Sequence, residues 1–189
     1  ELDHFESQLC WLKKSWNIIT PAQFEQMISG TEPIIGNNLL ITFDDGLSDH
    51  YIAAKILAKH GIKALFFLPT CIIEENLPAN PIIIHYCIAK FGVSKFIDEL
   101  NQYLKKYLND FQSYTIKFVK GQDDPHQTIK KIKKLFKYDL SSTISRKILL
   151  ELYETMFHSK YSDAMEIMHL TKEQISKMLE MGHSFGTHT

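Results

Sequence analysis

Two adjacent carboxylates near residue 45 are the side chains best placed to carry chemistry. The stretch LLITFDDGLSDHY runs from strand-favouring residues directly into Asp44, Asp45 and a glycine. Two neighbouring negative charges at the end of a buried strand repel each other and resist desolvation. A bound divalent metal ion would compensate both charges. The ordinary alternative is that acidic residues before a glycine form a turn or cap a helix.

A histidine in the segment GHSFGTHT is the second candidate. The segment has the pattern of a short strand that runs out to His188. Carboxylate oxygen and imidazole nitrogen are both zinc ligands. Taken alone, His188 would more often be an ordinary loop histidine. Because active groups collect at the carboxyl ends of parallel strands, the acidic pair and His188 together predict a metal site.

The elements around these residues have the pattern of a parallel α/β sheet. A continuous apolar run predicts a buried strand, a stretch with helical spacing follows, and a second apolar run stops at a proline. A capping-box sequence then predicts a helix directly before the GHSFGTHT strand, and another predicts a helix near the start of the chain. The expected segments are strands at 38–43, 62–68 and 183–189 and helices at 48–60, from Thr20 and from Thr171.

Residues 71–170 have a different character from the segments on either side. Strand signals fade and lysine-rich helical patterns replace them, over a length too great for a simple loop. We expect a helical insertion that serves as a lid or a groove wall, between core segments at 1–70 and 171–189. Residues 101–150 carry ten Lys and one Arg against four Asp and no Glu.

The basic insertion has several interpretations. A solvated helix face is the one we favour. An anionic glycan, a lipid-linked carrier or peripheral contact with a membrane surface would also suit its charge. No recognition motif for nucleic acid accompanies the lysines, so we expect no nucleic-acid partner.

Composition places the chain among ordinary globular proteins. Of its 189 residues, 44% are hydrophobic and 23% charged, and the formal net charge is −1. No run of 18 apolar residues is present, so we expect no transmembrane segment, and the first residues do not have the pattern of a signal peptide. Three cysteines without CxxC spacing favour a reducing compartment, so we expect a cytoplasmic location, with a secreted or envelope-associated protein as the alternative.

Four sequence motifs together resemble those of a known protein family. TFDDG, the helix after it, GIKALFFLP and LTKEQISKMLEMGHSFGTHT resemble the polysaccharide deacetylases that share the NodB homology domain. The resemblance covers about residues 1–70 and 170–189. TFDDG alone is moderately specific, and its combination with the later segments is strongly specific.

The resemblance implies a fold, an activity and roles for three residues. The family fold is a distorted (β/α)₇ barrel, so this α/β chain would form a partial barrel with a long helical insertion. The family's reaction is metal-dependent hydrolysis of N-acetyl or O-acetyl groups on a polysaccharide or sugar precursor. By position, Asp44 matches the general base, and Asp45 and His188 match ligands of a divalent metal, usually zinc. The implied partner is an acetylated glycan or sugar.

The chain also departs from the family pattern. The second histidine of the family's HT motif would fall four positions after His188, beyond Thr189, and the family's later motifs are absent. We expect the remainder of the barrel to follow Thr189. A catalytically impaired carbohydrate-binding or scaffold protein on the same fold is therefore an alternative. A phosphoryl-transfer receiver domain is a weaker one, because the GHSFGTHT segment would have no role in it.

Residues near the acidic pair have less specific interpretations. We expect Asp49 and His50 to cap the start of a helix rather than act directly in the site. Cys71 is expected to be a small buried side chain, and His183 a packing or hydrogen-bonding residue. Thr187 or Thr189 could order the region around His188 by hydrogen bonding.

Overall fold

The computed structural model describes residues 2–188 and divides the chain into two compact units. One comprises residues 1–76 and 166–189, and the other residues 77–165. The boundaries expected from the sequence lie at 70/71 and 170/171. Residues 71–76 and 166–170 thus group with the sheet-containing unit rather than with the helical insertion.

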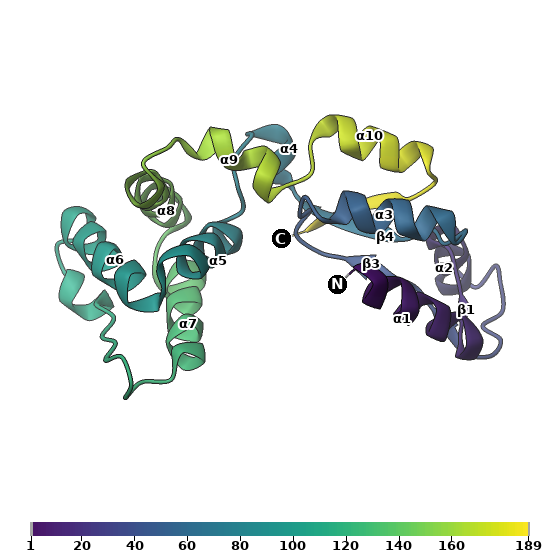
Figure 1. Ribbon diagram of the computed structural model, residues 1–189, viewed down its shortest axis with the longest axis horizontal. Coiled ribbons are helices and arrows are strands. Elements are labelled where there is room, and N and C mark those ends of the chain that lie inside the picture. Colours follow the sequence, from purple (N-terminus) through teal and green to yellow (C-terminus); the bar gives the residue numbers. More distant parts are fainter. Residues whose placement is uncertain (1, 189) are drawn as a thin grey trace. The chain divides into compact units, whose positions relative to one another are not determined.

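The first unit contains all the strands of the described residues (Figure 1). Its helices lie before, between and after them. In chain order the elements are α1 (Leu2–Ser15), β1 (Asn17–Ile18), α2 (Pro21–Ile28), β2 (Asn38–Leu39), β3 (Thr42–Phe43), α3 (His50–Lys59), β4 (Leu65–Pro69), α4 (Thr70–Glu74), α10 (Lys172–Glu180) and β5 (Ser184–His188).

Every strand pairing in this unit is parallel. β1 pairs with β2, and a three-stranded sheet has the order β3-β4-β5. The expected strand at 38–43 is divided into β2 and β3, because its first half pairs with β1 and its second half with β4. The prediction of a mixed α/β fold with parallel strands is confirmed. The described strands do not close into a barrel.

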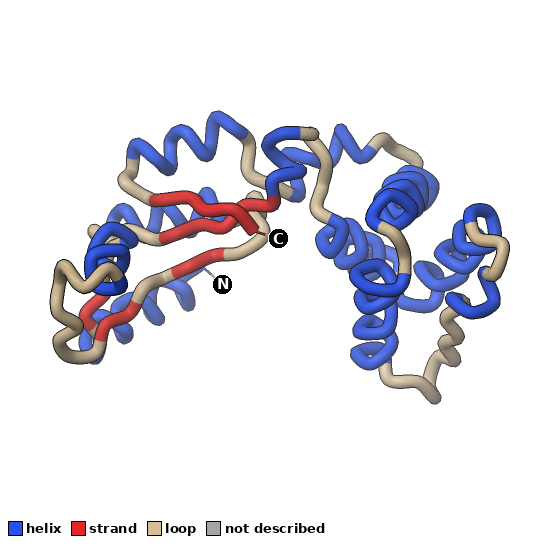
Figure 2. Tube along the Cα trace, turned by 180° about the vertical axis from the view of Figure 1, so that it is seen from behind, coloured by secondary structure: helices blue, strands red, loops and turns tan. Residues whose placement is uncertain are grey.

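The apolar run at 62–68 predicted a buried strand, and the first four residues of β4 alternate in burial. Phe66 and Leu68 are buried, whereas Leu65 and Phe67 remain half-buried. Helix α3 lies on one face of the strands, behind them in Figure 2. Side chains on alternate positions of a strand point to opposite faces, so the helix buries only every second residue. The prediction of a buried strand therefore holds for one face of β4.

Helix ends in this unit follow the sequence signals closely. Thr20 and Thr171 both form capping boxes, with Gln23 and Gln174 as the reciprocal partners. Helix α3 starts at His50 rather than at residue 48 and ends before Gly61, which has a φ of +67°. Only a residue without a Cβ adopts that conformation at no cost, so Gly61 releases the chain from α3 toward β4.

The second unit, residues 77–165, contains helices and loops but no strand. Its buried side chains are mainly Ile, Leu and Phe, so it has a core of its own. The helices are α5 (Asn80–Phe91), α6 (Val93–Tyr107), a 3₁₀ turn η1 (Phe111–Tyr114), α7 (Pro125–Lys134), a π-helical turn η2 (Leu135–Asp139) and α8 (Ser142–Phe157). Helix α9 (Tyr161–Met168) runs across the boundary between the units.

Two further expectations concern the whole chain. Among residues 2–188, no helix is both long and apolar enough to cross a membrane, as predicted. The three cysteines are free, with Cys10 exposed, Cys71 half-buried and Cys87 buried. Burial raises the pKa of the Cys87 thiol to about 12, so this side chain is inert and acts as a small apolar group.

Candidate functional site

The acidic pair lies on a tight loop directly after β3. Asp45 has a φ of +71° and Gly46 a φ of +57°, so two successive residues adopt the left-handed conformation. A Cβ at Gly46 would lie 2.7 Å from Leu68 Cδ2 and 2.8 Å from Ile72 Cδ1. Glycine suits position 46 for two reasons: it adopts the left-handed conformation, and it has no Cβ that would contact Leu68 and Ile72. A non-glycine residue in this conformation is strained, and such strain is concentrated at functional sites.

A short segment before α10 holds this loop in place. The Leu170 N–H donates to Gly46 O at 2.9 Å, and the Ser48 N–H donates to Met168 O at 3.2 Å. The Ser48 hydroxyl donates to Ile167 O at 2.6 Å. His169 is buried, and its Nδ1 lies 3.3 Å from Gly46 O. These contacts join two segments that are far apart in the sequence and fix the backbone beneath the carboxylates.

His188 comes to the acidic pair from the last strand of the sheet. β5 runs parallel to β4, with His188 opposite Pro69 in the register. Its Nδ1 lies 3.8 Å from Asp45 Oδ1, and its Nε2 lies 3.9 Å from Asp44 Oδ2. The imidazole therefore lies between the two carboxylates, with one ring nitrogen nearest to each. The structure thus brings the three site residues predicted from the sequence together at one edge of the sheet.

The distances at this site are too long for direct hydrogen bonds between His188 and the carboxylates. Both separations exceed the range of about 2.7–3.2 Å for an N–H···O hydrogen bond. Two ligands of a tetrahedral zinc ion, each about 2.0–2.1 Å from it, lie roughly 3.3 Å apart. Asp45 Oδ1 and His188 Nδ1, at 3.8 Å, are about 0.5 Å farther apart than that spacing, and both atoms are of the types that bind zinc.

The donor set within the described residues is nevertheless small. Among residues 2–188, no group of three or more His, Cys, Asp or Glu side chains is arranged to hold a metal ion. Structural zinc sites have four ligands and catalytic sites usually three from the protein. Asp45 and His188 therefore fit as part of such a set rather than as a complete one.

The two carboxylates differ in exposure. The Asp44 side chain is 62% exposed, against 35% for Asp45 and 34% for His188. The less exposed pair is the one expected to bind a metal, and the open carboxylate of Asp44 is accessible to water and to a substrate. This difference is what a division between ligand and base requires.

His183 is a structural residue, as the sequence indicated. Its Nδ1 accepts a hydrogen bond from the Ala64 N–H at 3.2 Å, so its Nε2 carries the proton and donates to Ala54 O at 3.0 Å. Its ring packs edge-on against Phe66. Burial lowers the pKa of His183 and thus favours the neutral form that both hydrogen bonds require.

His50 and His169 are also buried to different degrees near the loop. Burial lowers the pKa of His50, although the carboxylates of Asp49, Asp45 and Asp44 act in the opposite direction. Its ring packs against Phe43 and Phe66, and its Nδ1 has no hydrogen-bond partner among the described residues. Burial likewise lowers the pKa of His169, against its hydrogen bonds to backbone.

Expectations for the remaining neighbours are partly wrong. Asp49 occupies the N-cap position of α3, but its side chain makes no capping hydrogen bond, and His50 packs on aromatic rings instead of capping. Cys71 is half-buried rather than buried, because it lies at the start of the short helix α4. Thr187 is exposed, and Thr189 lies outside the described residues.

Sequence reasoning did not identify the segment 167–170 that supports the loop. Its contacts with Gly46 and Ser48 are made mainly by backbone atoms, which leave no residue-type signal. His169 alone had a recognisable side chain, but it stands in no motif. No protein-family model, no curated protein and no solved structure matches the chain.

Proposed function

We propose that the protein is a metal-dependent deacetylase that removes N-acetyl or O-acetyl groups from a polysaccharide or sugar precursor. The observation that carries the proposal is the position of His188 between Asp44 and Asp45, at distances of 3.9 and 3.8 Å. The strained conformation of Asp45 adds support, because a left-handed aspartate costs free energy that function can justify. The quoted resemblance to the polysaccharide deacetylases supplies the reaction type.

In this proposal, Asp45 and His188 hold a divalent metal, for which zinc suits a mixed oxygen and nitrogen donor set. A zinc ion bound there would polarise the acetyl carbonyl and lower the pKa of a water toward about 7. Asp44 accepts the proton of the attacking water, since its carboxylate is exposed and lies next to the ligand residue. Gly46 and the 167–170 segment keep both carboxylates at the strand end.

The larger architecture belongs to the same proposal. The parallel strands would be part of a distorted (β/α)₇ barrel, and residues 77–165 would serve as the lid or groove wall that selects the glycan. Peripheral membrane contact through the basic residues of that insertion and a cytoplasmic location are secondary parts of this proposal.

The test combines acetate release with metal content. Purified full-length protein, loaded with zinc, is incubated with acetylated chitin and peptidoglycan oligomers, and released acetate is measured enzymatically. We expect release that a chelator stops and that added zinc restores. Bound zinc without acetate release from any acetylated glycan would contradict the hydrolase and leave a metal-binding protein.

One observation favours a second candidate, a catalytically impaired carbohydrate-binding or scaffold protein on the same fold. The described residues contain no group of three potential metal ligands. A protein of this kind would bind acetylated oligomers without zinc and without turnover. Binding of such oligomers by calorimetry in the presence of a chelator separates the two candidates.

A further inference from the structure

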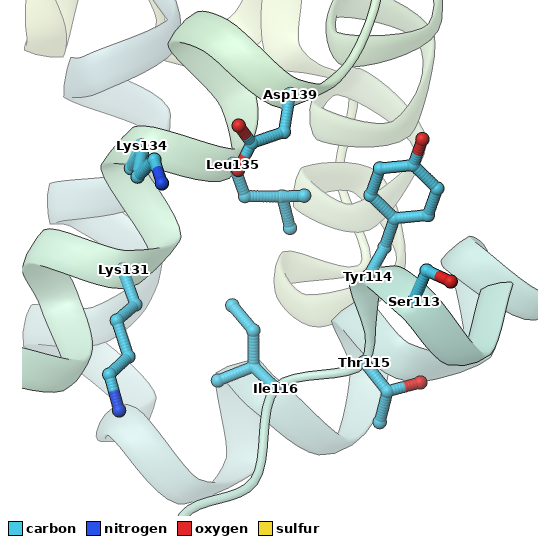
Figure 3. Close-up of a pocket in the computed structure, with 8 residues that line it drawn as sticks. All are labelled: Ser113, Tyr114, Thr115, Ile116, Lys131, Lys134, Leu135 and Asp139. Carbon is cyan, nitrogen blue, oxygen red and sulfur yellow. The ribbon is translucent and has the colours of Figure 1, made fainter.

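A cavity of about 500 Å³ lies within residues 77–165, far along the chain from the acidic loop. It opens between α7 with its π-helical turn and the segment that follows η1 (Figure 3). The residues that line it are Ser113, Tyr114, Thr115, Ile116, Lys131, Lys134, Leu135 and Asp139. Its volume is within the range of about 300–1,000 Å³ that small-molecule sites occupy and is much larger than a single inorganic anion needs.

Two lysines give one wall of the cavity a positive charge. Lys131 and Lys134 lie three positions apart on α7, so they share a face of the helix, and Figure 3 shows both on the same side of the cavity. Within residues 2–188, neither ammonium group has an ion-pair or hydrogen-bond partner. Both charges are therefore free to bind an anionic ligand.

The rest of the lining combines apolar side chains with hydroxyl groups and one carboxylate. Ile116 and Leu135 are buried residues whose side chains point into the cavity from opposite sides in Figure 3. Tyr114 adds an aromatic ring, and Asp139 adds a carboxylate at the rim. The Ser113 and Thr115 hydroxyls donate to Asp110 and to Phe111 O, so neither has a proton left to donate to a ligand.

The π-helical turn explains this arrangement of side chains. In η2 the Leu140 N–H donates to Leu135 O at 3.0 Å, five residues back, which widens the last turn of the helix. The buried Ser145 hydroxyl donates to Phe136 O at 3.0 Å and so stabilises the widened turn from outside. The turn places Leu135 in the cavity and Asp139 at its edge. Such turns occur frequently at functional sites.

Charge is distributed unequally between the two units. Residues 77–165 hold fourteen Lys and Arg against nine Asp and Glu, whereas the other unit holds seven against thirteen. The helical unit therefore carries a net positive charge, which favours the approach of anions. The cavity is where this general attraction coincides with a concave, partly apolar surface.

We propose that this cavity binds a small phosphorylated sugar. Lys131 and Lys134 bind the phosphate, Tyr114, Ile116 and Leu135 contact the apolar face of the sugar ring, and Asp139 accepts hydrogen bonds from its hydroxyl groups. A carboxylate in the cavity disfavours a ligand that is anionic throughout and favours one with a separate neutral, hydroxyl-rich part.

The test is a titration of the ¹⁵N-labelled chain with glucose 6-phosphate, inorganic phosphate and glucose, followed by amide chemical shifts. We expect saturable shifts at residues 113–116 and 131–139, with glucose 6-phosphate binding more tightly than inorganic phosphate. A double variant, Lys131→Ala with Lys134→Ala, should weaken glucose 6-phosphate binding about tenfold, since two charge-assisted contacts are lost.

The matched control removes the same charge from the same helix. Lys130 and Lys133 are exposed on α7 but do not line the cavity. The variant Lys130→Ala with Lys133→Ala should change the affinity less than about twofold, because only the general field is reduced. Equal weakening by both variants, or absence of saturable binding, overturns the site. Equal affinity for inorganic phosphate and glucose 6-phosphate overturns the assignment of a sugar.

Discussion

His188 Nδ1 lies 3.8 Å from Asp45 Oδ1, although the two residues come from distant parts of the chain and from two strands that are not neighbours. β3 and β5 lie on either side of β4, and because all three run in parallel their carboxyl ends meet at one edge. The loop after β3 turns back through two left-handed residues toward that edge. The convergence of carboxylate and imidazole is thus a property of the sheet.

Removal of either proposed ligand should weaken zinc binding strongly. We expect Asp45→Asn and His188→Ala each to lower zinc affinity by about 100-fold or more, since each removes one of few ligands. Isothermal titration with zinc measures this. His126→Ala is the control, because His126 is exposed in the helical unit. Retention of wild-type affinity in both site variants would show that zinc binds elsewhere.

Asp44 should matter for turnover but not for metal affinity. Asp44→Asn keeps the size of the side chain and removes its ability to accept a proton. We expect acetate release to fall by about 10² to 10⁴-fold while zinc affinity changes by less than about threefold. An unchanged rate in the zinc-loaded variant would rule out Asp44 as the base, and a parallel loss of zinc would make it a ligand.

Gly46 should tolerate no side chain. Gly46→Ala introduces a Cβ that would lie within 2.8 Å of the Leu68 and Ile72 side chains, in a left-handed conformation. We expect a loss of about 2–4 kcal/mol in the free energy of unfolding, measured by urea denaturation. Gly36 is the matched control, since its φ is +71° and nothing lies within 4 Å of its Cβ position. Gly36→Ala should cost only about 1 kcal/mol. Equal costs would mean that the contacts are irrelevant.

The backbone conformation of Asp45 should lower the stability of the folded protein. Because its φ is +71°, Asp45→Gly should be more stable than Asp45→Ala by about 1 kcal/mol. Asp98 provides the comparison, since it is exposed in the interior of α6 and there the alanine variant should be the more stable of the pair. Thermal unfolding of the four variants gives the order. The same order at both positions would argue against strain at Asp45.

His183 should make the protein less stable in mild acid. Burial lowers its pKa in the folded state below the ordinary value of 6.5, so below about pH 6.5 the unfolded chain binds a proton that the folded chain excludes. Stability is therefore retained above that pH and falls as pH decreases below it. His183→Gln should reduce the slope of unfolding free energy between pH 6.5 and 5 by up to about 1.4 kcal/mol per pH unit. An unchanged slope would show that His183 is not responsible.

The sequence by itself determined the local elements of this protein and singled out Asp44, Asp45 and His188, which the structure brings together. Capping boxes at Thr20 and Thr171 and the left-handed Gly61 were predictable, because they depend on side chains within a few residues of each other. The pattern of strand, helix and strand around Asp44 and Asp45 predicted the parallel sheet for the same reason.

Only the tertiary structure decided the features that depend on distant pairing. The division of 38–43 into β2 and β3 arises because different partners pair with its two halves. Pairing and packing between distant segments also decide three other features. These are the half-buried face of β4, the backbone contacts of residues 167–170 with Gly46, and the position of His188 between two carboxylates. Backbone hydrogen bonds and sheet register join segments that share no local pattern. These contacts therefore cannot be predicted from residue types alone.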